Sequence, residues 1–347
     1  MKVLIMSGGK GERFWPKSNI EKPKQFLCIV DKEKTMIQLT FDRALKLTEK
    51  ENIFVITGER YKKITKEQLP LMPDENILIE PEGRDTAACI GFALIHIQKK
   101  GKVPDEPVVI LASDHEIHPA VKFKKTIQTA EKIAEERDLI VTIGVKPSRP
   151  ETGYGYLKRG KKLTGYPGYY VSRFLEKPNI TLAMQYIESK EYLWNAGIFI
   201  TKPSVLLCEI EKYMPVLFKG LKEIESSIKD TEKTSQIFKK LEKISIDFGV
   251  MEKTDKIVTL EADFEWDDVG NWLALGRIFK EDKEHNICVG NTSIFDSKRM
   301  IVYNDLPDES IIAFGVKDLI VINSNKKIFI FPKDRIHEIK KIIKEIV

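Results

Sequence analysis

The sequence has few cysteines, and they are not arranged in a way that holds a metal ion or builds a disulfide framework. No two of the four form a Cys-x-x-Cys pair; they are scattered at Cys28, Cys89, Cys208 and Cys288. Structural zinc sites need closely spaced ligands, and disulfide frameworks belong mainly to small secreted domains. We therefore expect each thiol to lie in or near a core, with no structural zinc and no disulfide.

The sequence also lacks a long apolar run and a strong excess of charge of one sign. No apolar run reaches the length of about 18 residues that a membrane-spanning helix needs. Met1 leads directly into a strand-like segment and not into a signal peptide. The 57 basic residues face 52 acidic ones, which leaves a formal net charge of only +5, not the basic stripe of a nucleic-acid-binding protein. These absences predict a cytoplasmic protein that binds neither membranes nor nucleic acids.

Residues 3–25 are the most informative segment that is present. A strand-like apolar run at 3–6 leads into SGGKG at 7–11, and Arg13 and Lys24 follow shortly after. Glycines let backbone N–H groups approach an anion closely, and arginine and lysine neutralise phosphate charge. The spacing fits neither a Walker loop nor a dinucleotide fingerprint. We interpret the segment as a phosphate-binding loop of another type; the alternative is a surface turn with a glycine cluster.

Strand-like and helix-like patterns alternate over the first part of the chain. Apolar runs typical of buried strands lie at 53–57, 76–80, 108–113 and 139–145, and helical spacing lies between them at 36–47, 85–100 and 123–136. Such alternation predicts a mainly parallel sheet with helices on both faces. Beyond residue 150 the pattern predicts strand segments at 154–160, 169–178 and 192–201, a helix at 180–190 and a helical stretch at 203–243.

The last part of the chain has a different pattern of apolar residues. Short apolar runs make 287–332 dense in strands, and a helical pattern follows at 333–346. We place a boundary near residue 280. The predicted domains are 1–280 and a small β-rich C-terminal domain with a terminal helix, 281–347.

Four further segments place polar side chains directly after predicted strands. They are EPEGRDTA at 80–87, SDH at 113–115, FLEKP at 174–178 and EWDDVGNW at 265–272. In an open parallel sheet, loops after the strands gather at the edge where ligands bind. Each segment also has a simpler reading: FLEKP could be a surface ion-pair turn, and in the other three an acid or threonine could cap a helix. Their joint occurrence favours a ligand site.

One local expectation concerns the third of these segments. Proline disfavours the helical conformation of the residue before it. We therefore expect Pro178 to hold Lys177 in an extended backbone, so that Glu176 and Lys177 point in different directions.

Taken together, these segments resemble the sugar nucleotidyltransferases, and within them the mannose-1-phosphate guanylyltransferases. The family motifs are matched in order by GGKGERFWPKS (8–18), EPEGRDTAACI (80–90), SDH (113–115), TGYGY (152–156), FLEKP (174–178), WNAGIF (194–199), SIDFGVMEK (245–253) and WDDVGNW (266–272). The match covers residues 1–275. The departures from the family pattern are small exchanges at Ser113, Ala196, Phe248 and Gly249.

The resemblance implies a fold and an activity. The fold would be α/β, Rossmann-like of the GT-A type, with a mainly parallel or mixed sheet flanked by helices. The C-terminal domain would be of the short left-handed β-helix type that shorter relatives use in dimer contacts, so we expect a homodimer. The activity would be Mg²⁺-dependent transfer of GMP from GTP to α-D-mannose 1-phosphate, which gives GDP-mannose and pyrophosphate.

The resemblance also assigns roles to individual residues. The triphosphate would be held by the catalytic Arg13 and Lys24 and by the glycine loop with Ser7, Gly8, Gly9 and Gly11. The base pocket would contain Glu80, Pro81, Arg84 and Thr86, with Ser113 also in the nucleotide site; no group is assigned to guanine O6. The catalytic Lys177 would hold the sugar phosphate, and the sugar would meet Gly153, Gly155, Glu176, Asn195 and Asp247. Mg²⁺ would bind Asp114 and Asp268.

Three other activities bear on the interpretation. Some relatives carry a phosphomannose isomerase domain after the transferase, but His285 and His337 form no ligand cluster here, so we expect no isomerase activity. The nearest alternative is an adenylyl- or thymidylyltransferase that acts on glucose 1-phosphate. An alternative of another class is a catalytically silent nucleotide-sugar sensor subunit.

Overall fold

The computed structural model describes residues 1–9, 12–100 and 105–346, and the chain forms two compact units. The larger unit comprises Met1–Gly8, Thr40–Ser113 and Ile117–Trp266. The smaller unit comprises Gly9–Leu39, Asp114–Glu116 and Asp267–Val347. The units therefore do not correspond to one cut in the chain near residue 280, because two early segments belong to the smaller unit.

A nine-stranded sheet forms the centre of the larger unit, with the strand order β3-β2-β1-β4-β9-β6-β10-β8-β7. The strands are β1 (Lys2–Ser7), β2 (Ile53–Gly58), β3 (Ile77–Glu80), β4 (Val108–Ala112), β6 (Ile140–Val145), β7 (Gly155–Lys162), β8 (Tyr169–Glu176), β9 (Tyr192–Thr201) and β10 (Ile257–Glu261). Strands β1 to β4 are parallel neighbours, as are β6 and β10. Strand β9 runs antiparallel between β4 and β6, and β7 and β8 form an antiparallel hairpin. The predicted α/β fold with a mixed sheet is confirmed.

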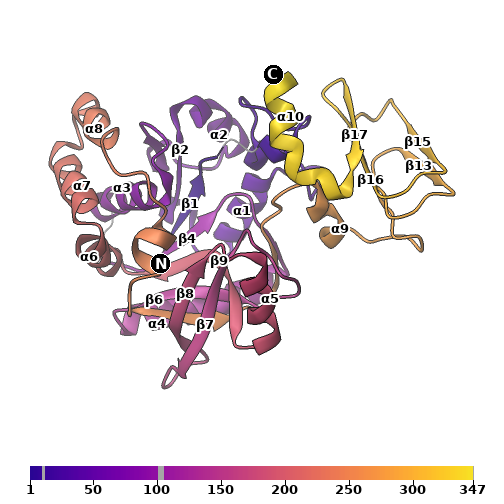
Figure 1. The fold of residues 1–347 in the computed structure, drawn as a ribbon. Coiled ribbons are helices and arrows are strands. Elements are labelled where there is room, and N and C mark those ends of the chain that lie inside the picture. The colour runs from indigo at the N-terminus through magenta and orange to yellow at the C-terminus, as the bar shows by residue number, and fades with distance from the viewer. Residues whose placement is uncertain (10–11, 101–104, 347) are drawn as a thin grey trace. The chain divides into compact units, whose positions relative to one another are not determined.

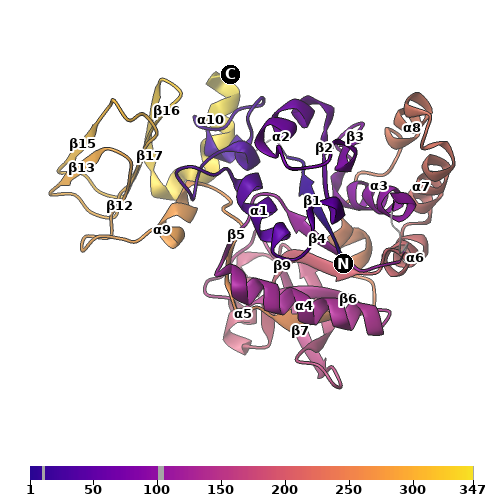
Figure 2. The same cartoon turned by 180° about the vertical axis from the view of Figure 1, so that it is seen from behind.

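Helices flank this sheet (Figures 1 and 2). They are α1 (Met36–Leu45, shared with the smaller unit), α2 (Lys62–Gln68), α3 (Asp85–Lys100), α4 (Ala120–Glu136), α5 (Ile180–Ser189), α6 (Pro203–Tyr213), α7 (Pro215–Ser227) and α8 (Thr231–Phe238). Helix α3 contacts strands β1 to β3 as well as α6 and α7, and its continuous apolar sequence suits burial on several sides. Helix α4 buries one stripe, which includes Phe123, Ile127 and Ala130, against β6 and β9 and turns its lysines away.

The smaller unit contains a parallel β-coil. Its strands are β12 (Ile287–Val289), β13 (Thr292–Phe295), β14 (Ile301–Asn304), β15 (Ile311–Phe314), β16 (Leu319–Ser324) and β17 (Lys327–Pro332), and helices α9 (Leu275–Ile278) and α10 (Ile339–Ile346) accompany them. Strands β12, β14 and β16 form one parallel ladder, β13 and β15 form another, and β17 adds an antiparallel edge. Asn304 and Asn323 stack on successive turns, 19 residues apart, and share a hydrogen bond of 3.2 Å. The strand-rich C-terminal domain is thus confirmed.

The early segment 9–39 belongs to the smaller unit because it shares a core with the β-coil. The Trp272 ring is fully buried, with its centroid 5.0 Å from those of Phe14 and Tyr303. Its indole N–H donates to the carbonyl of Trp15 at 3.0 Å. This buried aromatic cluster excludes water from the contact between segment 9–39 and the β-coil. Strands β5 (Glu116–His118) and β11 (Glu265–Asp267) form a separate two-stranded sheet.

In the parts of the chain that the structure describes, no helix combines the length and the apolar character that crossing a membrane requires.

Candidate active site

The predicted site residues divide between the two units. The larger unit holds Ser7, Gly8, Glu80, Pro81, Arg84, Thr86, Ser113, Gly153, Gly155, Glu176, Lys177, Asn195 and Asp247, and the smaller unit holds Gly9, Arg13, Lys24, Asp114 and Asp268. Gly11 lies outside the described residues.

In the smaller unit, Lys24 joins the two predicted metal acids. Its side chain is only 8% exposed, and its ammonium lies 3.0 Å from Asp114 Oδ2. The same ammonium donates to the backbone carbonyl of Asp268 at 2.5 Å. The two acids are far apart in the sequence, yet one lysine contacts both residues. Lys24 therefore organises this cluster as well as being a candidate phosphate ligand.

The charge on Asp114 is maintained by its neighbours. Burial by itself raises the pKa of this carboxyl, but Lys24 and then His115 outweigh burial and hold the pKa below its usual value. The carboxylate is therefore ionised at neutral pH. An ionised, partly buried carboxylate is the type of ligand that a hard divalent cation prefers. Among the described residues, no group of three or more His, Cys, Asp or Glu side chains converges on one point, so a cation held here needs further oxygen ligands from a bound phosphate or water.

The loop that carries Asp268 is held in a costly conformation. Val269 is buried and has a φ of +47°, which is a rare conformation for a β-branched residue. Its N–H donates to Asp267 Oδ1 at 2.8 Å, and Asp267 forms an ion pair with Arg277 at 2.5 Å. The cap of the following short helix is Asn271 and neither of the two acids, which was the simpler alternative. These contacts fix the direction of the Asp268 carbonyl toward Lys24.

The glycine loop is anchored by a residue that was not among the predicted site residues. The side-chain amide of the buried Gln25 donates to the carbonyl of Gly9 at 3.4 Å. Gly9 is exposed, has a φ of +133°, and has no heavy atom within 4 Å of the place where a Cβ would stand. Arg13 is exposed on the short 3₁₀ helix Glu12–Phe14. The signal for Gln25 was present in the sequence, since it follows Lys24 in the PKQF segment.

In the larger unit, polar groups gather after β1, β3 and β4. Ser7 is fully buried, and within the described residues its hydroxyl has no hydrogen-bond partner. The carboxyl of Glu80 lies 3.3 Å from the place where a Cβ of Gly8 would stand. Burial raises the pKa of Glu80 to about 7. The N–H of Ser113 donates to the carbonyl of Met6 at 3.0 Å, which continues the pairing of β4 with β1. An unsatisfied hydroxyl beside a glycine loop is a group available to a ligand.

Two residues predicted for the base pocket have partners within the protein. Arg84 pairs with Glu82 at 2.8 Å and also donates to the carbonyl of Lys239. The hydroxyl of Thr86 accepts a hydrogen bond of 2.8 Å from the N–H of Ile246. Both side chains thus tie the start of α3 to the segment before residue 247.

Asn195 is the centre of a second network. Its Oδ1 accepts from the Thr142 hydroxyl at 2.9 Å and from the N–H of Gly197 at 3.2 Å. These two donors orient the amide, and its Nδ2 then donates to Asp247 Oδ1 at 3.1 Å. Burial, and then the negative charge of Glu176, raise the pKa of Asp247 to about 7. Thr142 was missed by sequence reasoning, because a threonine inside an apolar strand is ordinary there.

The conformation expected for Lys177 is wrong. Its φ is +51°, in the left-handed region, and its N–H donates to the carbonyl of Tyr154 at 3.1 Å. This turn brings the ammonium to 2.5 Å from Glu176 Oε1, so the two side chains point together and not apart. The N–H of Glu176 is in turn held by Glu252 Oε1 at 2.7 Å. Glu252 belongs to the SIDFGVMEK motif and was available to sequence reasoning, but was not singled out.

Gly155 makes room for this acid. A Cβ at this position would lie 2.5 Å from Glu176 Oε2 and 3.2 Å from the Phe174 ring. At Gly153 a Cβ would meet only Glu151 Oε1, at 3.2 Å. The two glycines of the same motif therefore differ: one is required by packing and the other is exposed.

Comparison with known proteins places the chain in a class. Residues 2–285 match the family described as "Nucleotidyl transferase", and residues 290–346 match a "MannoseP isomerase/GMP-like beta-helix domain". The α/β sheet and the β-coil correspond to these two matches. The fold and the sequence thus define a nucleotidyltransferase.

Individual relatives show which kind of nucleotidyltransferase the chain is similar to. A mannose-1-phosphate guanylyltransferase of Escherichia coli (strain K12) is 34% identical over an alignment of 352 positions that covers 99% of this chain and 73% of that protein. A solved structure described as mannose-1-phosphate geranyltransferase from Thermus thermophilus has a TM-score of 0.89 and 30% identity, over 99% of this chain and 98% of the other. A mannose-6-phosphate isomerase structure from Helicobacter pylori (TM-score 0.63, 24% identity, 77% of this chain and 100% of that one) is similar in fold. The chain belongs to the mannose-1-phosphate guanylyltransferase family of nucleotidyltransferases.

Proposed function

We propose that this enzyme transfers GMP from GTP to α-D-mannose 1-phosphate, with Mg²⁺ as cofactor. An oxygen of the sugar phosphate attacks the α-phosphorus in line, the new P–O bond forms, and the bond to the β-phosphate breaks as pyrophosphate leaves. The observation that carries the proposal is the similarity, over 99% of this chain, to a mannose-1-phosphate guanylyltransferase. Two polar networks at the predicted residues support it.

Lys24, Arg13 and the glycine loop would neutralise charge on the nucleotide. The chemistry needs no protein nucleophile, because positioning and charge stabilisation supply the rate. Lys24 and Arg13 would stabilise the leaving pyrophosphate, and the glycine loop would offer backbone N–H groups. Mg²⁺, held by Asp114 and Asp268, would supply positive charge at the phosphates. The carboxylate of Asp114 is ionised, and carboxylate oxygens are ligands that Mg²⁺ prefers.

Lys177 and the network around Asn195 would hold the sugar phosphate. The Lys177 ammonium would meet the phosphate, and its contact with Glu176 already directs it. Glu176, Asn195 and Asp247 present carboxylate and amide groups suited to sugar hydroxyls. Because Asn195 is fixed by two donors, its amide is oriented before the ligand arrives.

We infer that Glu80 selects guanine. A carboxylate accepts from both N1–H and N2–H of guanine, whereas adenine offers no such pair of donors. Glu80 is only 8% exposed, so leaving its carboxylate without a hydrogen-bond donor is costly. A base that offers no such donors is therefore rejected.

Replacing Glu80 with Gln is expected to raise the KM for GTP about 100-fold and to weaken the preference for GTP over ATP. Because the pKa of Glu80 is about 7, the acid is protonated below that pH, and GTP affinity of the unmodified enzyme should fall as pH falls through 7. The KM for GTP is measured from about pH 5.5 to about pH 8.5 for both proteins. Ionisation of GTP itself affects both equally, so a dependence that persists unchanged in Glu80→Gln contradicts the assignment.

The reaction is tested by Mg²⁺-dependent release of pyrophosphate. GTP with mannose 1-phosphate is compared with ATP, dTTP and glucose 1-phosphate. Turnover with GTP and mannose 1-phosphate alone is expected, without interconversion of mannose 6-phosphate and fructose 6-phosphate. Turnover with another pair would retain the chemistry and replace the substrates. A folded protein that binds nucleotide without turnover with any pair would be a sensor subunit.

We also propose a homodimer formed through the β-coil. Phe295 and Phe314, register partners on β13 and β15, are 58% and 74% exposed, and Ile312 beside them is 70% exposed. Ile328 and Ile330 on the edge strand β17 are exposed as well. So much exposed apolar surface on a small domain is typical of an interface, and a second copy is the occupant that we propose.

Phe314→Asp is therefore expected to weaken the dimer at least about 100-fold, because it places a charge in an apolar contact. Sedimentation velocity over a range of concentrations measures this. Val216→Asp on α7, which is also an exposed apolar site (65%), serves as the control and should leave the dimer intact. A monomeric parent protein would refute the interface.

A further inference from the structure

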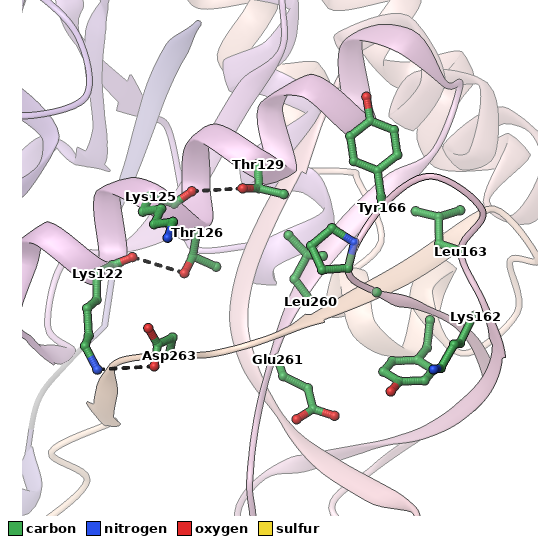
Figure 3. Close-up of a pocket in the computed structure, with 13 residues that line it drawn as sticks. Lys122, Lys125, Thr126, Thr129, Lys162, Leu163, Tyr166, Leu260, Glu261 and Asp263 are labelled. Carbon is green, nitrogen blue, oxygen red and sulfur yellow. Dashed lines mark hydrogen bonds and ion pairs between the residues drawn. The ribbon is translucent and has the colours of Figure 1, made fainter.

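The larger unit contains a cavity that lies outside the predicted active site. Its volume is about 540 Å³, and none of its described lining residues is a predicted site residue. The walls come from α4, from the turn between β7 and β8 at 162–169, and from the end of β10 at 260–263. In Figure 3, Lys122, Lys125 and Thr126 project from α4, while Lys162 and Leu163 stand on the hairpin opposite.

The cavity lies at the far end of the hairpin from the sugar network. Gly155 and Glu176 pair where β7 begins and β8 ends. The cavity contacts the other end, where Lys162 ends β7 and Tyr169 begins β8. A strand rises about 3.3 Å per residue, so the two ends of β7 are roughly 20 Å apart. The cavity is thus not an extension of the sugar site.

The floor of the cavity is apolar, while α4 lines it with lysines and threonines. Leu163 and Leu260, 4% and 3% exposed, form the floor. The partly exposed rings of Tyr166 and Tyr169 stand beside them, and the Arg159 guanidinium lies 5.6 Å from the centroid of the Tyr169 ring. A concave surface of this size that combines apolar and polar groups is typical of a small-molecule site.

The charges around the cavity leave an excess of positive charge. Lys122 pairs with Asp263 at 3.2 Å, and Arg159 pairs with Glu261 at 2.7 Å, so both acids on the rim are compensated. Across the described residues, neither Lys125 nor Lys162 forms an ion pair within 4.0 Å; their side chains stand on opposite walls (Figure 3). Two ammonium groups on either side of an apolar floor suit an anionic group on a ring.

We propose that this cavity is a second ligand site, which binds a small organic anion that combines a flat apolar ring with a phosphate or carboxylate group. The ring would lie on Leu163 and Leu260 beside the tyrosines. The anion would lie between Lys125 and Lys162. Both halves of the ligand contribute, so the ring without the anion, or the anion without the ring, should bind more weakly.

Titration with 2-naphthyl phosphate, followed by calorimetry, tests the proposal. Saturable binding of one equivalent is expected, and 2-naphthol or inorganic phosphate should bind at least about tenfold more weakly. Replacing both Lys125 and Lys162 with Met keeps the apolar stems, removes the charges and should raise the Kd about tenfold or more. The control pair Lys124→Met and Lys161→Met changes the adjacent exposed lysines, which do not line the cavity, and should leave the Kd unchanged.

Two further variants test whether 2-naphthyl phosphate binds in this cavity or elsewhere in the protein. Thr126→Trp fills the cavity from α4 and should abolish binding. Lys177→Met disables the proposed sugar-phosphate site and should leave 2-naphthyl phosphate binding unchanged. Binding that is lost in Lys177→Met, or that is insensitive to Lys125, Lys162 and Thr126, would overturn the proposal, as would the absence of binding.

Discussion

Replacing Asp114 with Asn is expected to lower kcat/KM about 1,000-fold, the largest effect of any single change considered for this enzyme. The carboxylate is held ionised by Lys24 and His115, and it lies 3.0 Å from the ammonium of Lys24, the lysine predicted to hold the triphosphate. Asparagine keeps the shape and removes the charge that would attract a cation. Steady-state pyrophosphate release, measured over a range of Mg²⁺ concentrations, is the test, and a higher Mg²⁺ requirement should accompany the loss.

The same variant should also lose stability, which requires a control. Lys24 is 8% exposed and Asp114 is 33% exposed, so the pair lies between a buried and a surface ion pair. Leaving the lysine without its partner is expected to cost about 2 kcal/mol, between the values for those two extremes. Denaturant unfolding measures this cost.

Adding Lys24→Met to Asp114→Asn tests the source of the stability loss. The double variant has no unpaired charge, so it should recover most of the lost stability; its activity stays low in any case, because Lys24 is itself a proposed phosphate ligand. No recovery of stability in the double variant would show that the loss in Asp114→Asn does not come from an unpaired lysine. Full activity in Asp114→Asn at unchanged Mg²⁺ would remove this residue from the metal site.

Much of the larger unit was predictable because its elements carry strong local signals. Buried parallel strands such as 53–58 and 140–145 are continuous apolar runs, and the helix at 85–100 has a regular apolar pattern. Strand β10 was not singled out, although it lies inside the sheet between β6 and β8. Its sequence, IVTLE, is too short for periodicity to separate a strand from other buried segments.

Long-range packing accounts for what local patterns did not show. Segment 9–39 belongs to the smaller unit because Phe14 meets Trp272, a contact that no local pattern indicates. In the β-coil, only a few positions, such as Asn304 and Asn323, have the same residue on successive turns. The other positions on each turn need only be apolar, so the sequence shows no clear repeat. At Lys177, the hydrogen bond to Tyr154 outweighs the preference that Pro178 imposes. In each case a contact between distant residues decides the local conformation.

Among the predicted site residues, motif membership indicated where to look but not what each side chain does. Arg84 and Thr86 lie in the expected motif, yet the structure uses both to hold α3 in place. Gln25 follows the predicted Lys24, Glu252 lies in the SIDFGVMEK motif, and both orient their neighbours through hydrogen bonds to the backbone. Such supporting roles depend on which atoms face each other, and the order of residues does not contain that information.

Gly155→Ala is expected to raise the KM for mannose 1-phosphate about 30-fold, with a loss of stability of about 1 kcal/mol. The added Cβ would lie 2.5 Å from Glu176 Oε2 and 3.2 Å from the buried Phe174 ring, so the carboxylate must move and the ring must shift slightly. The carboxylate is the end of a flexible side chain, which keeps the loss of stability small. Moving it also displaces the partner of Lys177, and loss of one charge-assisted hydrogen bond to the sugar costs about 2 kcal/mol.

Gly153→Ala is the matched control, since it adds the same methyl group to the same TGYGY segment. Its Cβ would approach only Glu151 Oε1, at 3.2 Å, from an exposed position. The KM for mannose 1-phosphate should therefore stay within about twofold of the parent value, and the KM for GTP should be unaffected by either change. Equal effects of the two alanines would mean that flexibility of the segment matters, and not the position of Glu176. An unchanged KM in Gly155→Ala, with Glu176 shown to have moved, would exclude this acid from the sugar site, because a displaced ligand group cannot leave binding intact.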